Sequence, residues 1–168
     1  MITGQVRLLS PDLRHDVNTD VIAPSAFMRV PEEELGKHAF SGVIPDFQAW
    51  LDGATVLIAG RNFGCGSSRE QAPKALIRCG IALICAESFA SIFFRNALNL
   101  GLGALALPTT SADAFGPGER IAADLERGTI RKEDGTELQG HPLGAHLMKI
   151  VDAGGILPMI RRQQAAVQ

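Results

Sequence analysis

The residues best suited to chemistry lie in a glycine-rich stretch at 60–70, which reads Gly-Arg-Asn-Phe-Gly-Cys-Gly-Ser-Ser-Arg-Glu. An apolar run at 54–59 precedes this stretch, and an apolar pattern of helical spacing follows it, which predicts a strand, a turn and a helix. Glycines let a ligand approach the backbone closely, and the free amides at a helix start favour anions. The guanidinium of Arg69 can bind a carboxylate through two parallel hydrogen bonds. The stretch therefore predicts a site for a small carboxylate beside the hydroxyls of Ser67 and Ser68.

The serines also have a purely structural interpretation. Ser67 and Glu70 have the spacing of a capping box, in which the serine only completes a helix start. Pro73 favours a later start, because a proline beyond the first turn loses a hydrogen bond and clashes with the preceding turn. A helix that begins between 69 and 72 leaves the serine side chains free for a ligand.

Three familiar glycine-loop chemistries do not match this stretch. No lysine follows Gly66, as a nucleotide P-loop requires, and Arg69 stands where a dinucleotide fingerprint has its third glycine. The Gly-x-Ser-x-Gly pattern of a hydrolase nucleophile elbow is missing around Ser67. The turn must therefore serve another kind of chemistry.

Three segments of the chain carry a family resemblance. The stretch at 60–73 resembles the signature of the aconitase-type swivelling domain, above all in the stand-alone small subunits of 3-isopropylmalate dehydratase. The segment at 16–24 resembles the Asn-Thr-Asp motif of that family, and the segment at 86–101 resembles its second long motif. The resemblance extends over about residues 1–163, in the order and spacing of the family. These long motifs specify the family much better than they specify the substrate.

The pattern of the chain predicts a single α/β domain over 1–168 with an added β-meander. Strands and helices alternate in the first two thirds, which favours parallel pairing, and short strands separated by turn signals follow. Strands are expected at 1–9, 55–59, 81–86, 104–107, 120–125, 129–132 and 137–138. Helices are expected at 32–38, 71–79, 89–100, from 141 and at 156–161, with a short helix or turn at 47–51 and a turn-like, then extended segment at 18–24. The resemblance refines this architecture to the three-layer swivelling β/β/α domain of the aconitase C-terminal domain.

The resemblance implies dehydration and rehydration of a hydroxy-dicarboxylic acid, with Ser67, Arg69 and Asp20 as the expected catalytic set. In the family the first serine of the motif, here Ser67, removes a proton next to a carboxylate. A serine hydroxyl is too weakly acidic for this unless preorganised donors stabilise its alkoxide. Arg69 matches the arginine that binds the substrate carboxylate and supports that oxyanion, and Ser68 is expected to add a hydrogen bond to the substrate. Asp20 matches an aspartate that orients active-site groups, although a turn aspartate that bonds its own backbone is an equal alternative.

Substrate choice is expected in the loop at 26–30, because the family's stand-alone small subunits meet the variable group of the substrate there. The loop reads Ala-Phe-Met-Arg-Val. Phe27, Met28 and Val30 suit an isopropyl group, so isopropylmalate, an intermediate of leucine biosynthesis, is the expected substrate. Arg29 suits an extra carboxylate, which makes a homoaconitase-type or a dimethylmalate/citraconate-type dehydratase the alternative. An Arg29 side chain that points to solvent would carry no information about substrate.

The three cysteines do not predict a metal site in this chain. Cys65, Cys79 and Cys85 lack the Cys-x-x-Cys spacing of cluster ligands, and the last two lie on apolar segments. The resemblance implies instead a large partner subunit, in a heterodimer or heterotetramer, whose [4Fe-4S] cluster acts as the Lewis acid on the leaving hydroxyl. The enzyme would be active only with that partner. A non-catalytic module that holds a carboxylate with Ser67 and Arg69 is a second alternative.

Composition limits the other possibilities. The chain has 168 residues, of which 46% are hydrophobic and 20% charged, as expected for one globular domain. Its formal net charge of −2, without strong basic clusters, gives no support for nucleic-acid binding. No apolar stretch predicts a membrane span or a signal peptide, and an odd number of cysteines favours a reducing cytoplasm.

Overall fold

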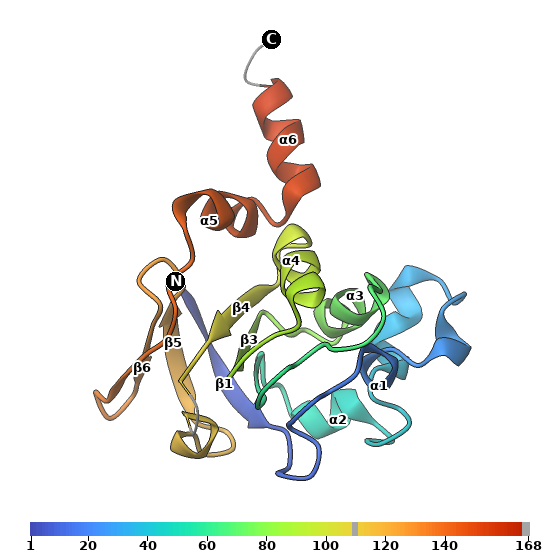
Figure 1. Cartoon of the computed structure of the whole chain (residues 1–168), viewed down its shortest axis with the longest axis horizontal. Coiled ribbons are helices and arrows are strands. Elements are labelled where there is room, and N and C mark those ends of the chain that lie inside the picture. The colour runs from blue at the N-terminus through green and yellow to red at the C-terminus, as the bar shows by residue number, and fades with distance from the viewer. Residues whose placement is uncertain (109–110, 166–168) are drawn as a thin grey trace.

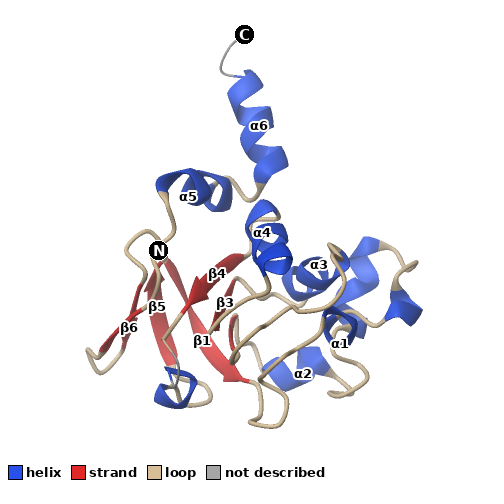
Figure 2. Ribbon diagram, viewed as in Figure 1, coloured by secondary structure: helices blue, strands red, loops and turns tan. Residues whose placement is uncertain are grey.

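A seven-stranded sheet forms the centre of the computed structural model, which describes residues 1–108 and 111–165. The strands lie in the order β4-β3-β2-β1-β5-β6-β7. Their bounds are Ile2–Leu8 (β1), Val56–Ile58 (β2), Leu83–Ala86 (β3), Gly103–Ala106 (β4), Arg120–Asp124 (β5), Thr129–Lys132 (β6) and Glu137–Gln139 (β7). The strand β1 joins two halves, because it pairs in parallel with β2 and antiparallel with β5 (Figure 2).

The two halves of the sheet differ in the way the sequence predicts. All residues of β2 and β3 are buried, as is typical of parallel strands covered on both faces. The antiparallel strand β5 instead alternates, with Ile121 and Ala123 buried and its other residues partly or fully exposed. The expected α/β arrangement with an added β-meander is therefore confirmed.

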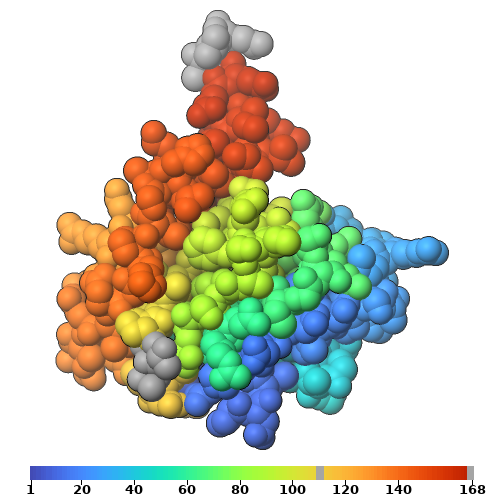
Figure 3. Space-filling view, viewed as in Figure 1, coloured from blue at the N-terminus to red at the C-terminus, as the bar shows by residue number. Residues whose placement is uncertain are grey.

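Six α-helices and three short 3₁₀ helices accompany the sheet in the described part of the chain. The α-helices are Thr19–Ile22 (α1), Phe47–Leu51 (α2), Gln71–Arg78 (α3), Ser91–Asn99 (α4), Ala145–Asp152 (α5) and Ile156–Ala165 (α6). The 3₁₀ helices are Ser25–Phe27 (η1), Glu32–His38 (η2) and Ser111–Ala114 (η3). None of these helices is both long and apolar enough to cross a membrane. Figures 1 and 3 show α6 at the red end of the chain, standing away from the sheet.

The structure predicted for one segment was wrong. The residues at 18–24 were expected to be turn-like and then extended, yet one turn of helix, α1, forms there. The side chain of Asn18 accepts a hydrogen bond from the backbone N–H of Asp20 at 2.8 Å and so caps this helix. The local asparagine cap thus decides the structure of a segment that is too short for a periodic pattern.

The core has two layers, one on each face of the parallel strands. Leu57 and Ile84 belong to one apolar cluster, which includes the buried face of α3 and Phe93 of α4. Their strand neighbours Val56 and Leu83 belong to the other cluster. This alternation follows from the pleat, which points successive side chains to opposite faces. The packed sheet thereby holds the loop after β2 and the start of α3 in place.

Candidate active site

Two segments far apart in the sequence lie side by side at the candidate site. The carbonyl of Val17 accepts from the N–H groups of Gly64 at 2.8 Å and Cys65 at 3.2 Å. The N–H of Thr19 in turn donates to the carbonyl of Cys65 at 2.8 Å. The structure therefore brings the N-terminal Asn-Thr-Asp motif against the glycine-rich turn, which are the two motifs that the sequence singled out.

The contact between these motifs is so close that position 66 requires a glycine. Gly66 has a φ of +94°, and a Cβ built there would lie 2.5 Å from the side-chain oxygen of Asn18. The buried hydroxyl of Thr19 donates to the carbonyl of Ser67 at 3.0 Å. These contacts position the backbone of Ser67 from the opposite segment, while its side chain stays exposed.

Arg69 and Asp20 form an ion pair across the two segments. The guanidinium is mostly covered, with 21% of the side chain exposed, whereas the carboxylate is 49% exposed. The N–H of Arg69 also donates to the carbonyl of Ser67 at 2.8 Å. The carboxylate of Asp20 thus bonds Arg69, which differs from the alternative of a turn aspartate that bonds its own backbone.

The helix after the turn begins where the position of Pro73 predicts. The first residue of α3 is Gln71, and Glu70 makes no side-chain cap bond there. Pro73 is then the third helical residue, where its missing N–H would have no intrahelical partner in any case. The side chains of Ser67 and Ser68 are exposed in the turn before the helix. The turn therefore presents two hydroxyls beside one guanidinium, which is a set of donors for an anionic ligand.

The loop expected to recognise the substrate divides into inward and outward residues. Phe27 stacks on the His38 ring, with 3.8 Å between centroids and 4° between planes. Phe27 and Met28 line a small hollow that also includes Gln71, two residues after Arg69. Val30 packs against the core cluster, whereas Arg29 is exposed. Val30 is thus partly engaged in packing, and Phe27 and Met28 are the apolar residues of the loop that lie near Gln71.

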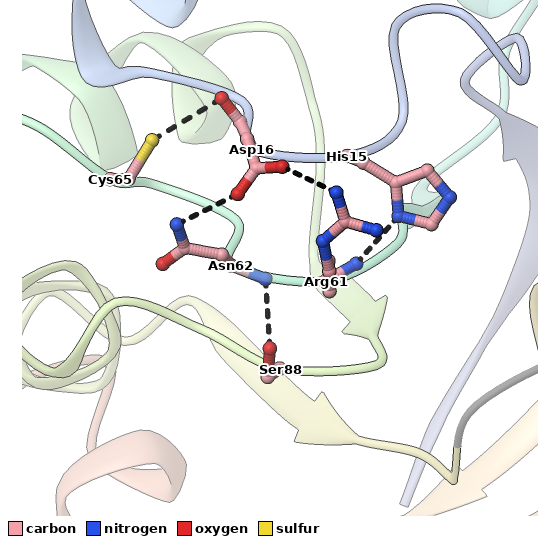
Figure 4. Close-up of polar contacts among 6 residues, drawn as sticks. All are labelled: His15, Asp16, Arg61, Asn62, Cys65 and Ser88. Carbon is pink, nitrogen blue, oxygen red and sulfur yellow. Dashed lines mark hydrogen bonds and ion pairs between the residues drawn. The ribbon is translucent and has the colours of Figure 1, made fainter.

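Sequence reasoning assigned no role to a polar cluster that joins the same two segments. Figure 4 shows that the carboxylate of Asp16 accepts from Arg61 at 2.9 Å and from the Asn62 side chain at 3.0 Å. The hydrogen bond from Asn62, together with Arg61, holds the pKa of Asp16 below its usual range despite partial desolvation. The ring of His15 accepts from the N–H of Arg61, and the hydroxyl of Ser88 accepts from the N–H of Asn62. Asp16 and Asn62 stand inside two of the quoted family motifs, and that was the signal that could have identified them.

The pKa values of all three cysteine thiols are raised in this chain. Burial raises the pKa of Cys79 to about 12 and raises that of the fully buried Cys85 further. Burial and the charge of Asp16 also raise the pKa of Cys65, whose thiol donates to the carbonyl of Asp16 at 3.2 Å. Among residues 1–108 and 111–165, no group of three or more His, Cys, Asp or Glu side chains has the arrangement of a metal site.

Comparisons with known proteins agree with this geometry. The family model of the aconitase C-terminal domain matches residues 29–110. A 3-isopropylmalate dehydratase small subunit from Methanopyrus kandleri is 44% identical over 150 residues, which are 88% of each chain. A methanogen homoaconitase small subunit from Methanothermobacter thermautotrophicus is 40% identical, over 84% of this chain and 82% of the relative.

A solved structure extends the similarity to nearly the whole chain. The crystal structure of a 3-isopropylmalate dehydratase (leuD) from Methanocaldococcus jannaschii superposes with a TM-score of 0.84 and 32% identity. The match covers 98% of this chain and 96% of that one. An isopropylmalate/citramalate isomerase small subunit from the same organism is 37% identical over 92% of both chains. The expected swivelling fold is therefore confirmed.

Proposed function

The chain belongs to the family of 3-isopropylmalate dehydratase small subunits, and from this premise we propose that it is the small subunit of a heteromeric hydro-lyase. The enzyme isomerises 2-isopropylmalate and 3-isopropylmalate by dehydration and rehydration in leucine biosynthesis. The observation that carries the proposal is the Arg69–Asp20 ion pair, formed two residues after the exposed Ser67. The three free cysteines support a reducing compartment such as the cytoplasm.

Ser67 acts as the base in this proposal. Its alkoxide removes the proton from the carbon next to a substrate carboxylate, and it returns a proton in the reverse direction. The neighbouring guanidinium of Arg69 stabilises both the alkoxide and the bound carboxylate, because donors fixed in advance cost no reorganisation during the reaction. Asp20 holds Arg69 in orientation by accepting one of its five N–H groups, and the remaining donors can face the substrate. Ser68 adds a hydrogen bond to the substrate.

The Lewis-acid part of the reaction belongs to the partner. We assign the [4Fe-4S] cluster of the family to a large subunit that covers the exposed Ser67 and Ser68. The relatives named as small subunits support the existence of that partner. The complex is a heterodimer or a heterotetramer. A site formed by two chains explains why this chain shows its candidate base on an open surface.

The substrate loop supports isopropylmalate as the first choice of substrate. Phe27 and Met28 are partly exposed apolar side chains near Gln71 at the start of α3, and an isopropyl group suits contact with such side chains. Arg29 is the observation that favours a second candidate, a homoaconitase-type or dimethylmalate/citraconate-type dehydratase. Its guanidinium is exposed and suits an extra carboxylate, and one relative is named as a homoaconitase small subunit.

The experiment that tests the proposal is anaerobic dehydratase activity after mixing the chain with a reconstituted large subunit of isopropylmalate dehydratase. Activity on isopropylmalate is expected, and Ser67→Ala should lower kcat by about 10²- to 10⁴-fold, as for loss of a general base. Ser10→Ala changes an exposed serine in the loop after β1 and is the matched control, which should keep full activity. Turnover of homoaconitate or methyl-substituted malates, without turnover of isopropylmalate, would show that the substrate is one of those acids. Failure to associate with any large subunit, combined with tight binding of a small acid by the chain alone, would favour a non-catalytic carboxylate-binding module.

A further inference from the structure

Asp16 contacts three residues of the segment that leads into the catalytic turn. Its N–H donates to the carbonyl of Arg61 at 2.9 Å, and its carboxylate accepts from the side chains of Arg61 and Asn62. Its own carbonyl accepts from the thiol of Cys65 at 3.2 Å. A single residue thus bonds three positions of the neighbouring segment, as Figure 4 shows.

The backbone at this contact is unusual on both sides. Asp16 has a φ of +51° and Asn62 has a φ of +55°, a left-handed conformation that few residues other than glycine adopt. Asparagine and aspartate tolerate it best. The hydroxyl of Ser88 also accepts a hydrogen bond from the N–H of Asn62 at 2.8 Å. The two segments therefore meet at a pair of left-handed residues whose side chains bond each other.

The contacts that begin at Asp16 continue in order to the candidate site. After the Asp16–Arg61 contact come the bonds of Gly64 and Cys65 to Val17, and then the bond from Thr19 to Cys65. The series ends with the hydrogen bond from the hydroxyl of Thr19 to the carbonyl of Ser67 and with the Arg69–Asp20 ion pair. A slip of one residue along this series would separate Asp20 from Arg69.

We propose that Asp16, acting through Asn62, is a positioning residue that fixes the register of residues 16–20 against residues 61–69 and so sets the geometry of Ser67. This inference rests on the proposed function, because it assigns Asp16 a part in that reaction. The charge of the Asp16–Arg61 pair contributes little, since both side chains are at least half exposed. The specific acceptor geometry of the carboxylate toward two donors is what matters.

Two substitutions test these hydrogen bonds while they keep residues that tolerate a positive φ at both positions. Arg61 and Asn62 donate to different oxygens of the Asp16 carboxylate, so Asp16→Asn, which replaces one oxygen by an NH₂ group, loses one of the two bonds. Adding Asn62→Asp restores both bonds, because the new amide of residue 16 then donates to the new carboxylate of residue 62. Asp134→Asn is the matched control: this aspartate also caps a turn, accepting from the N–H of Thr136 at 2.8 Å, in the β6–β7 hairpin.

The kinetic test uses each variant in complex with the large subunit. Asp16→Asn should lower kcat about tenfold or more, as expected for a misplaced catalytic group, with a smaller change in KM and unchanged association with the large subunit. The double variant should recover most of the lost kcat, and Asp134→Asn should behave as the unaltered chain. Full activity of Asp16→Asn, or a double variant as poor as the single one, would overturn the inference.

A second measurement on the isolated chain separates this inference from the proposed function. Hydrogen exchange at the amides of Gly64 and Thr19, which bond across the two segments, should be faster in Asp16→Asn and should slow again in the double variant. Unchanged exchange at both amides would overturn the inference even if the complex is active. An inactive complex of the unaltered chain, with exchange altered as expected, would overturn the proposed function and leave the register role of Asp16 supported.

Discussion

The guanidinium of Arg69 bonds the carboxylate of Asp20, although the two residues are 49 positions apart in the sequence. Asp20 lies in the first turn of α1, and Arg69 lies just before α3. The helices α1 and α3 pack against each other, so their N-terminal ends bring the two charges together. A carboxylate ligand that reaches Arg69 would therefore meet a guanidinium already oriented by a second chain segment.

This orientation makes Arg69 a sensitive position for a conservative change. Arg69→Lys keeps the positive charge but loses the planar fork, so one ammonium must serve both Asp20 and the substrate. The expected result is a rise in KM for isopropylmalate of about ten- to a hundredfold, the cost of one lost charge-assisted bond. Steady-state kinetics of the complex measures it. Arg120→Lys, an exposed arginine on β5, is the control, and equal KM values for the two variants would contradict a binding role for Arg69.

A substitution at Arg29 is expected to distinguish the two substrate classes. Arg29→Leu should leave kcat/KM for isopropylmalate within about threefold, because an apolar substituent has no use for a guanidinium at this exposed position. The measurement compares isopropylmalate and homoaconitate with the matching large subunits, and Lys37→Leu in η2 controls for loss of an exposed cation. A large loss on homoaconitate alone would identify Arg29 as the partner of the extra carboxylate.

A substitution at Gly66 tests the close contact between the two motifs. Gly66→Ala should lower the free energy of unfolding by about 1–3 kcal/mol, because alanine is strained at its φ of +94° and its Cβ would collide with Asn18. Gly53→Ala is the matched control, since Gly53 also has a positive φ, +77°, but open space around the site of a Cβ. Denaturant unfolding of the isolated chains measures both. If both variants lose the same stability, the collision with Asn18 has no energetic consequence.

The raised pKa of Cys79 predicts that the protein loses stability at alkaline pH. Burial raises the pKa of this thiol from 9.0 to about 12, so the folded protein retains a proton that the unfolded chain releases. The resulting stability is fully present below pH 9 and is lost as pH rises from 9 toward 12. The difference in free energy of unfolding between the unaltered chain and Cys79→Ala should therefore shrink between pH 8 and pH 11 under reducing conditions. It should be constant between pH 7 and pH 8, which serves as the internal control.

Much of the fold was predictable because long apolar segments determine it. The buried runs that became β2 and β3 and the periodic segments that became α3 and α4 were all expected, within a few residues of their observed bounds. The short helix α1 was not expected, since a single asparagine cap decides it. Local capping of this kind competes with other turn geometries of similar energy, and sequence periodicity carries no information about it.

The candidate site was predictable as a set of residues but not as an arrangement. The glycine-rich turn predicted Ser67 and Arg69 as site residues, and the family motif predicted Asp20. The polar contacts of Asp16 with Arg61 and Asn62 depend on the pairing of two distant segments, which no spacing in the sequence reveals. Val30, predicted to meet the substrate, also packs partly against the core, a contact that the sequence pattern did not indicate.

The position of β1 also constrains the order in which the protein can be assembled during synthesis. This strand precedes both of its partners along the chain, and about 110 residues separate its end from the start of β5. The edge that pairs with β5 therefore stays open to other chains until residues 120–124 are made, and an open strand edge is a template for aggregation. A nascent chain that stalls before β5 would expose one such edge permanently, so bound chaperones would be expected on that intermediate rather than on the finished subunit.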